Sequence, residues 1–195
     1  DKRASIYHID FSFDKQRLGG SAFAQSLGKI GDDVPTVVNP EYFADAFNAI
    51  QQLIEKGWIM AGHDISAGGL VTTLLEMCFA NTEGGMHINL HDLVASEDGQ
   101  PDIVKALFAE NPGVVIQVSD EHKVDFRKFM EKQGIGFAKI GYPVEDSRTI
   151  EIVWPAGADH DASNQALSLD IDHLRHVWYK TSYLLDCKQS FNGKA

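Results

Sequence analysis

Residues 58–80 read WIMAGHDISAGGLVTTLLEMCFA, and this stretch decides both the fold and the candidate site. Residues 58–63 are mostly apolar and predict a buried strand. A short polar turn with two glycines follows, and an apolar helix is expected from about Gly69 to Ala80. The stretch therefore predicts a strand, a glycine turn and a helix in immediate succession.

The rest of the chain alternates further strands with helices. Strands are expected at 6–13, 86–90, 114–118, 136–142 and 148–154, and helices at 21–27, 40–57, 101–110, 120–133 and from about 170 onward. Glu145 to Ser147 predict a hairpin turn, so the strands on either side of it are expected to pair antiparallel. Residues 156–166 are expected to form a loop. The pattern predicts an α+β fold, a mixed and largely antiparallel sheet flanked by helices.

Two units are expected along the chain. Residues 1–169 predict one domain, because no low-complexity linker and no internal repeat interrupts them. Residues 170–195 predict a C-terminal helical extension. The first residue is Asp1, which suggests that the chain was cut from something longer and that its function is not self-contained.

Composition excludes several classes of protein. The 195 residues carry 28 acidic and 17 basic side chains, a net charge of −11, and this balance argues against a nucleic-acid-binding surface. No apolar run approaches the roughly 20 residues that a membrane span needs. Two cysteines are too few for a disulfide framework in a chain of this length. The sequence is that of a globular protein, expected in the cytoplasm with reduced thiols.

The glycine turn at 64–69 is the most informative candidate site. A helix start presents amide groups and the positive end of the helix dipole, which favour an anion. The turn lacks the lysine of a phosphate-binding P-loop, and Lys56 is the only base between residues 30 and 90. A magnesium ion would supply the missing positive charge, with Asp64 as its ligand and Ser66 as a donor to a phosphate or ribose oxygen. The alternative is that Asp64 or Ser66 merely caps the helix.

Other polar residues indicate less. His87 and His91 share the polar face of one strand, which favours exposure to solvent, and a zinc site at His173 and His176 lacks identifiable partners. Cys78 is expected to be a buried thiol, and Cys187 has no activating neighbour beyond Lys188. Glu76 is unusual in an apolar helix, so we expect a partnered carboxylate or an interface role there.

Four segments resemble a known family. HDISAGGLVTTLLEMCFA at 63–80 is similar to the signature of the C-terminal-type domain of the aminoimidazole ribonucleotide synthetase superfamily. LGGSAFAQ at 18–25, LFAENPGVVIQV at 107–118 and LRHVWYKTSYLLDCKQS at 174–190 resemble, within that superfamily, the second such domain of the phosphoribosylformylglycinamidine synthases.

The resemblance implies an ATP-dependent ligase of purine biosynthesis. Such an enzyme uses ATP and glutamine-derived ammonia to convert formylglycinamide ribonucleotide into its amidine. The family pattern assigns Asp64 as a Mg²⁺ ligand and Ser66 as an ATP contact, whereas Ala67 stands where some relatives have an acid. The remaining ligands are expected from N-terminal-type synthetase domains and the glutaminase nucleophile from a downstream domain of the same polypeptide. The excised chain is therefore expected to be inactive alone.

Overall fold

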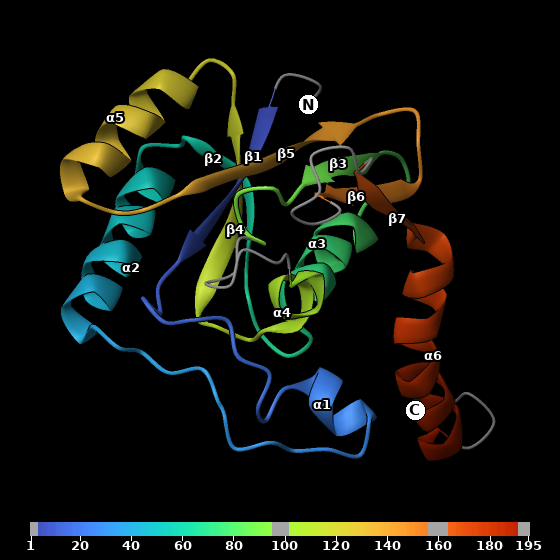
Figure 1. Cartoon of the computed structure of the whole chain (residues 1–195). Coiled ribbons are helices and arrows are strands. Elements are labelled where there is room, and N and C mark those ends of the chain that lie inside the picture. Colours follow the sequence, from blue (N-terminus) through green and yellow to red (C-terminus); the bar gives the residue numbers. More distant parts are fainter. Residues whose placement is uncertain (1–3, 95–101, 156–163, 191–195) are drawn as a thin grey trace.

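The computed structural model of the chain describes residues 4–94, 102–155 and 164–190. Its strands form one seven-stranded sheet in the order β2-β4-β1-β5-β3-β6-β7 (Figure 1). The strands are β1 (Ala4–Asp10), β2 (Ile59–Asp64), β3 (Gly85–Asn89), β4 (Gly113–Ser119), β5 (Ala138–Val144), β6 (Thr149–Trp154) and β7 (Gln165–Asp170). The helices are α1 (Ala22–Ser26), α2 (Pro40–Glu55), α3 (Gly69–Phe79), α4 (Ile103–Phe108), α5 (Lys123–Gln133) and α6 (Ile171–Gln189).

The sheet is mixed and largely antiparallel, which confirms the expected fold class. Only β3 and β6 pair parallel, and the other pairings are antiparallel. The predicted hairpin is wrong, because β5 and β6 do not pair with each other. Instead β3 lies between them, antiparallel to β5 and parallel to β6. A turn signal in the sequence marks where the chain reverses, but it does not show whether a distant strand inserts between the two arms.

The last strand was not expected from the sequence. Residues 165–170 form β7, which pairs antiparallel with β6 at the sheet edge. Its exposed, mixed sequence, QALSLD, gives a weak strand pattern, and the ladder to β6 supplies the hydrogen bonds that stabilise it. The predicted loop at 156–166 therefore ends earlier than expected, and its residues 156–163 lie outside the described part of the chain.

Two hydrophobic cores cover the two faces of the sheet. Side chains of α3 and α4 pack on one face, and Ile6 of β1 belongs to this core. Side chains of α2 and α5 pack on the other face, and Tyr7 and Ile9 of β1 belong to that core. Alternate residues of β1 thus serve opposite cores, as the two-residue period of a strand requires. Figure 1 shows α2 with α5 and α3 with α4 as two separate pairs of helices.

Strand β2 is an edge strand and is not buried as the sequence predicted. It pairs only with β4, and most of its residues are exposed, Met60 among them. An apolar run has the same appearance in a buried strand and in an edge strand, so the pattern alone does not separate the two. The carboxyl end of this edge strand carries Asp64.

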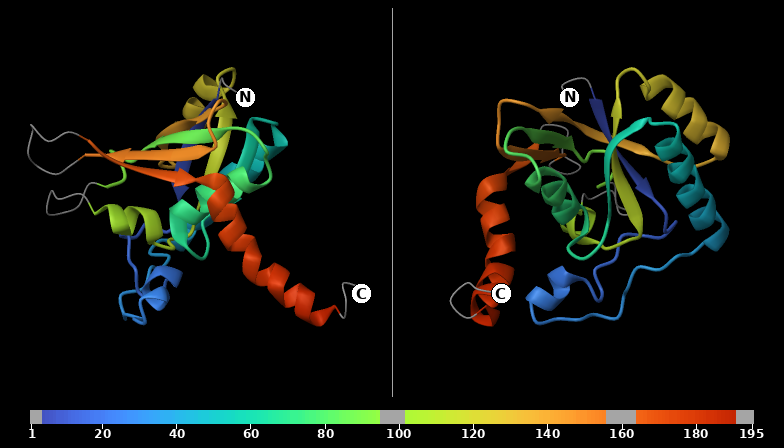
Figure 2. Two further views of the ribbon diagram at one scale, coloured as in Figure 1. Left: turned by 90° about the vertical axis from the view of Figure 1, so that its right-hand side faces the viewer. Right: turned by 180° about the vertical axis from the view of Figure 1, so that it is seen from behind.

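Helix α6 extends away from the sheet (Figure 2). Its first residue, Ile171, is fully buried, and most later residues are exposed. The exposed large apolar side chains of α6 are Val177, Trp178, Tyr179, Tyr183, Leu184 and Leu185. The base of the helix is fixed by Asp172, whose carboxylate receives two hydrogen bonds from the guanidinium of Arg148. No helix in the described part of the chain is long and apolar enough to cross a membrane.

Candidate functional site

The turn between β2 and α3 depends on two consecutive glycines. Gly68 and Gly69 have φ angles of 93° and 70°, in the left-handed region that favours glycine. A Cβ on Gly69 would also lie 2.8 Å from the carbonyl oxygens of Leu107 and Ala109, which is too close for any side chain. The glycines therefore let the first turn of α3 pass directly over the end of α4.

Two amides of this turn, those of Gly68 and Gly69, already have acceptors within the protein, so for these two the expectation of free amides is wrong. The Gly68 N–H donates to Glu110 Oε1 at 2.8 Å, and the Gly69 N–H donates to the Ser66 carbonyl at 3.0 Å. The same Glu110 oxygen accepts the amide of Ala22, the first residue of α1, at 2.8 Å. Sequence reasoning missed Glu110, which lies more than forty residues from the motif. Its carboxylate holds two loops together and makes the Gly68 amide unavailable to an external anion.

Asp64 combines a fixed main chain with a free carboxylate. Its carbonyl oxygen lies 2.7 Å from His63 Nδ1 and accepts the Thr73 hydroxyl at 3.2 Å. Its side chain is 74% exposed, and the only ion-pair contact recorded for it in the described residues is His63 Nδ1, at 3.5 Å. A carboxylate that is exposed on an immobilised backbone is a suitable hard oxygen ligand for a divalent cation.

Ser66 is likewise exposed, and its hydroxyl forms no hydrogen bond to any described residue. Ile65, between the two polar residues, donates its amide to the Gly113 carbonyl at 2.9 Å and packs against the α3 core. The residue that caps α3 is Gly68, with no side-chain hydrogen bond. The capping role considered for Asp64 or Ser66 is therefore wrong, and both side chains remain available to a ligand.

Glu76 has partners on two other elements. Its Oε2 lies 3.4 Å from His63 Nε2 on β2, and its Oε1 accepts the indole N–H of Trp178 on α6 at 3.1 Å. The expectation of a partnered carboxylate at this position is confirmed. Trp178 itself was noticed in the sequence only as a mark of family resemblance, because nothing in the local pattern relates it to a residue 102 positions away.

The described residues contain no group of three or more histidine, cysteine, aspartate or glutamate side chains that could hold a metal ion. Asp64 is thus at most one ligand of a larger set. His173 and His176 are exposed and belong to no such group. His91 is exposed as expected, whereas His87 is only partly exposed and stacks on Tyr142 at 5.2 Å. Cys78 is buried as expected, and burial raises its pKa to about 11.

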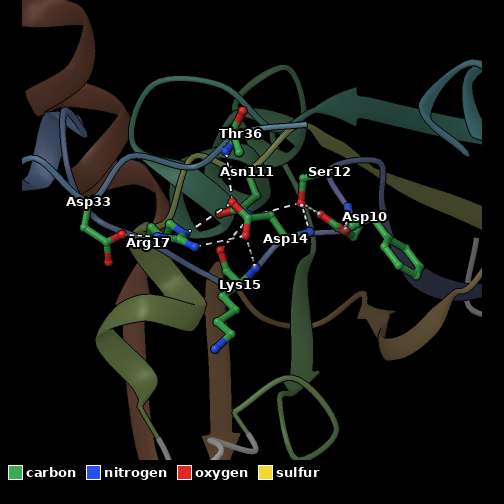
Figure 3. A network of polar contacts seen from close by, with 9 residues as sticks. Asp10, Ser12, Asp14, Lys15, Arg17, Asp33, Thr36 and Asn111 are labelled. Carbon is green, nitrogen blue, oxygen red and sulfur yellow. Dashed lines mark hydrogen bonds and ion pairs between the residues drawn. The ribbon is translucent and has the colours of Figure 1, made fainter. Parts of the chain in front are cut away.

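A polar network fixes the loop that follows β1 (Figure 3). The Asn111 side-chain amide donates to Ser12 Oγ at 3.0 Å and to the Lys15 carbonyl at 3.1 Å. Asp14 accepts the amides of Lys15 and Thr36, and Arg17 bridges Asp14 and Asp33. These contacts stabilise residues 10–17 beside a cavity of about 280 Å³ that Ile65 of the motif also lines.

Solved structures share this fold. The T. maritima PurL complexed with FGAR superposes with a TM-score of 0.63 at 13% identity, covering 90% of this chain and 28% of that chain. The T. maritima PurL complexed with ATP gives a TM-score of 0.59 at 11% identity, covering 90% and 26%. At these identities the likeness concerns the fold alone.

Sequence comparison reaches further. A probable phosphoribosylformylglycinamidine synthase, chloroplastic/mitochondrial, of Arabidopsis thaliana is 38% identical over 183 residues, which are 93% of this chain. The chain spans only 12% of that relative's length, so it matches one part of a much larger protein. The family model of the AIR synthase related protein, C-terminal domain, matches residues 12–153, and this span contains the Asp64–Gly69 turn, Glu110 and strands β2 to β5. The chain belongs to the family of AIR synthase related proteins, C-terminal domain.

Proposed function

We propose that the chain is one domain of an ATP-dependent carbon–nitrogen ligase of the phosphoribosylformylglycinamidine synthase type. The full enzyme would convert formylglycinamide ribonucleotide, ATP and glutamine into formylglycinamidine ribonucleotide, ADP, phosphate and glutamate. The observation that carries the proposal is the pair of exposed polar side chains, Asp64 and Ser66, on an immobilised turn. The similarity to the A. thaliana relative supports the choice of reaction.

In this proposal Asp64 binds Mg²⁺ and Ser66 donates a hydrogen bond to the nucleotide. The donor set fits in part, because one exposed carboxylate is a suitable Mg²⁺ ligand while the described residues hold no complete cluster. Bound Mg²⁺ would neutralise phosphate charge during phosphoryl transfer, which depends mainly on positioning and electrostatics. Thr73 and His63 would keep the Asp64 main chain fixed. The Glu110 carboxylate occupies the Gly68 amide, so this amide cannot bind a phosphate. Neutralising the phosphate charge therefore depends more on the metal ion.

The proposal places this chain among further domains of one polypeptide. N-terminal-type synthetase domains would supply the other Mg²⁺ ligands, and a glutaminase domain would supply ammonia. We propose residues 1–169 as the synthetase C-terminal-type domain and residues 170–195 as a C-terminal extension, containing helix α6, that leads toward the glutaminase; residues 191–195 lie outside the described part of the chain. The cytoplasm is the proposed location, supported by the two free cysteines, Cys78 and Cys187. The A. thaliana relative is named as chloroplastic/mitochondrial.

The test uses the complete polypeptide that contains this chain. Isothermal titration with MgADP should show roughly tenfold weaker binding for Asp64→Asn than for the wild type, because a charged ligand is lost. Asp45→Asn, an exposed acid on α2, is the matched control and should bind as the wild type does. Unchanged binding by Asp64→Asn would exclude the metal role.

The reaction is tested separately by measuring ADP release. Release should require the ribonucleotide together with glutamine or ammonia. ADP formation without a nitrogen donor would instead indicate another ATP-dependent member of the superfamily. A tightly held, unexchangeable ADP, with normal turnover of Asp64→Asn, would make this domain a scaffold with a structural nucleotide site.

A further inference from the structure

Helix α6 contacts α3, the helix that follows the Asp64–Gly69 turn. Trp178 donates its indole N–H to Glu76 Oε1 at 3.1 Å, and its ring lies 5.4 Å from the ring of Phe79. Arg175, one turn earlier on α6, donates to the carbonyl oxygen of Phe79 at 3.3 Å. Beyond these contacts most of α6 is exposed, so this short stretch joins the projecting helix to α3.

The Glu76 carboxylate also contacts strand β2. Glu76 Oε2 lies 3.4 Å from Nε2 of His63, and Nδ1 of that ring lies 2.7 Å from the carbonyl oxygen of Asp64. Since a carbonyl oxygen only accepts, Nδ1 carries the hydrogen in this bond. The ring thus lies between the Glu76 carboxylate on α3, which faces Nε2, and the Asp64 main chain, which Nδ1 contacts, and it donates to both when both nitrogens carry hydrogen.

We propose that Trp178, Glu76 and His63 are positioning residues that set the orientation of Asp64 according to the placement of α6. This inference rests on the proposed function, because it takes Asp64 as the metal ligand. It adds that the C-terminal helix controls the geometry of that site. A displacement of α6 releases Glu76, and Glu76 releases the His63 ring. Asp64 then loses the His63 contact and keeps the Thr73 hydroxyl and its pairing with Val114 of β4.

The position of each residue supports this transmission. β2 is a sheet edge paired on one side only, so its free side depends on side-chain contacts. Glu76 is a charged residue on an otherwise apolar part of α3, and its side chain is only 23% exposed. A carboxylate in such surroundings is stable when both oxygens have partners. His63 of β2 and Trp178 of α6 are those partners.

Nuclear magnetic resonance on the 195-residue chain tests the coupling. Trp178→Phe removes the indole donor and keeps an aromatic ring against Phe79, whereas Trp154→Phe is the matched control, since Trp154 donates its indole N–H to Gln165 at 3.0 Å. Trp178→Phe should shift the His63 ring signals and the Asp64 amide signal, and Trp154→Phe should leave them in place. Glu76→Ala should produce the same shifts as Trp178→Phe. Glu76→Gln retains an oxygen that can accept the indole N–H, so its His63 and Asp64 signals should stay close to those of the wild type.

A titration of the complete polypeptide with MnCl2, with the free ion counted by electron paramagnetic resonance, gives the second measurement, because the other metal ligands are expected from further domains. Trp178→Phe and Glu76→Ala should weaken Mn²⁺ binding at Asp64 roughly threefold, the size expected from one partly exposed hydrogen bond. Unmoved His63 signals in Trp178→Phe would overturn the coupling. A complete wild-type polypeptide that binds no Mn²⁺ would contradict the metal role of Asp64, and the His63 signals of the 195-residue chain would still decide the coupling.

Discussion

The Glu110 carboxylate accepts the amide hydrogen of Gly68 at 2.8 Å, and with it closes the turn that carries Asp64 and Ser66. Its Oε1 also holds the first amide of α1, so one side chain joins two loops that lie far apart in the sequence. A carboxylate is well suited to this place because it faces the positive end of the α3 dipole. The motif turn is thus organised by the protein itself before any ligand binds.

Glu110→Ala should therefore destabilise the chain by about 1–3 kcal/mol, since two amides lose a charged acceptor. Glu110→Gln keeps one oxygen in place and should cost less. Urea unfolding followed by circular dichroism measures both, with Glu121→Ala, an exposed acid before α5, as the matched control. Equal stability of Glu110→Ala and the control would show that the two hydrogen bonds contribute nothing net.

Gly69→Ala tests the crowding at the start of α3. Gly69 and Gly57 have nearly the same φ, 70° and 69°, but a Cβ on Gly57 would meet nothing within 4 Å. Gly57→Ala should therefore cost only the strain of a left-handed alanine, about 1–2 kcal/mol. Gly69→Ala carries that strain and the clash with two carbonyl groups, so its loss of unfolding free energy should be clearly larger. Similar losses for the two variants would contradict the close packing of α3 on α4.

The sequence predicted the elements well and their pairing less well, for a physical reason. Caps and periodicity are local. Asn39 and Asp170 cap α2 and α6, which begin where the sequence predicted helices. Pairing is not local, so the insertion of β3 between β5 and β6 and the edge position of β2 could not be predicted. The strand β7 was missed because its polar, exposed sequence depends on β6 for its hydrogen bonds.

The candidate site divides in the same way. Asp64 and Ser66 were identified because their chemistry follows from a contiguous motif. Glu110, Thr73 and Trp178 contribute through tertiary contacts, and two of these span 42 and 102 positions. The signal that was available locally was Glu76, a charge in an apolar helix, which correctly indicated a partner without naming it.

Stability should decrease in mild acid because of His8. Burial lowers the pKa of His8 below its usual 6.5, and the neighbouring Asp10 offsets this only in part. The unfolded chain therefore binds more protons than the folded chain as the pH falls below about 6.5, and the contribution of neutral His8 is lost there. Unfolding free energies at about pH 7.5 and about pH 5.5 should differ less for His8→Gln than for the wild type. His91→Gln, at an exposed position, should keep the wild-type difference, and an equal difference in all three proteins would contradict the role of His8.

The two thiols should react at very different rates. Cys187 is exposed near the end of α6, whereas Cys78 is buried in α3 with a pKa raised to about 11. The thiolate is the reactive form, so at about pH 8 a disulfide reagent should modify Cys187 quickly and Cys78 only when the core opens. Cys187→Ser should remove the fast phase, and urea above the unfolding midpoint should make Cys78 react at the rate of an exposed thiol. A fast phase of two thiols in the folded wild type would mean that α3 does not stay packed against the sheet.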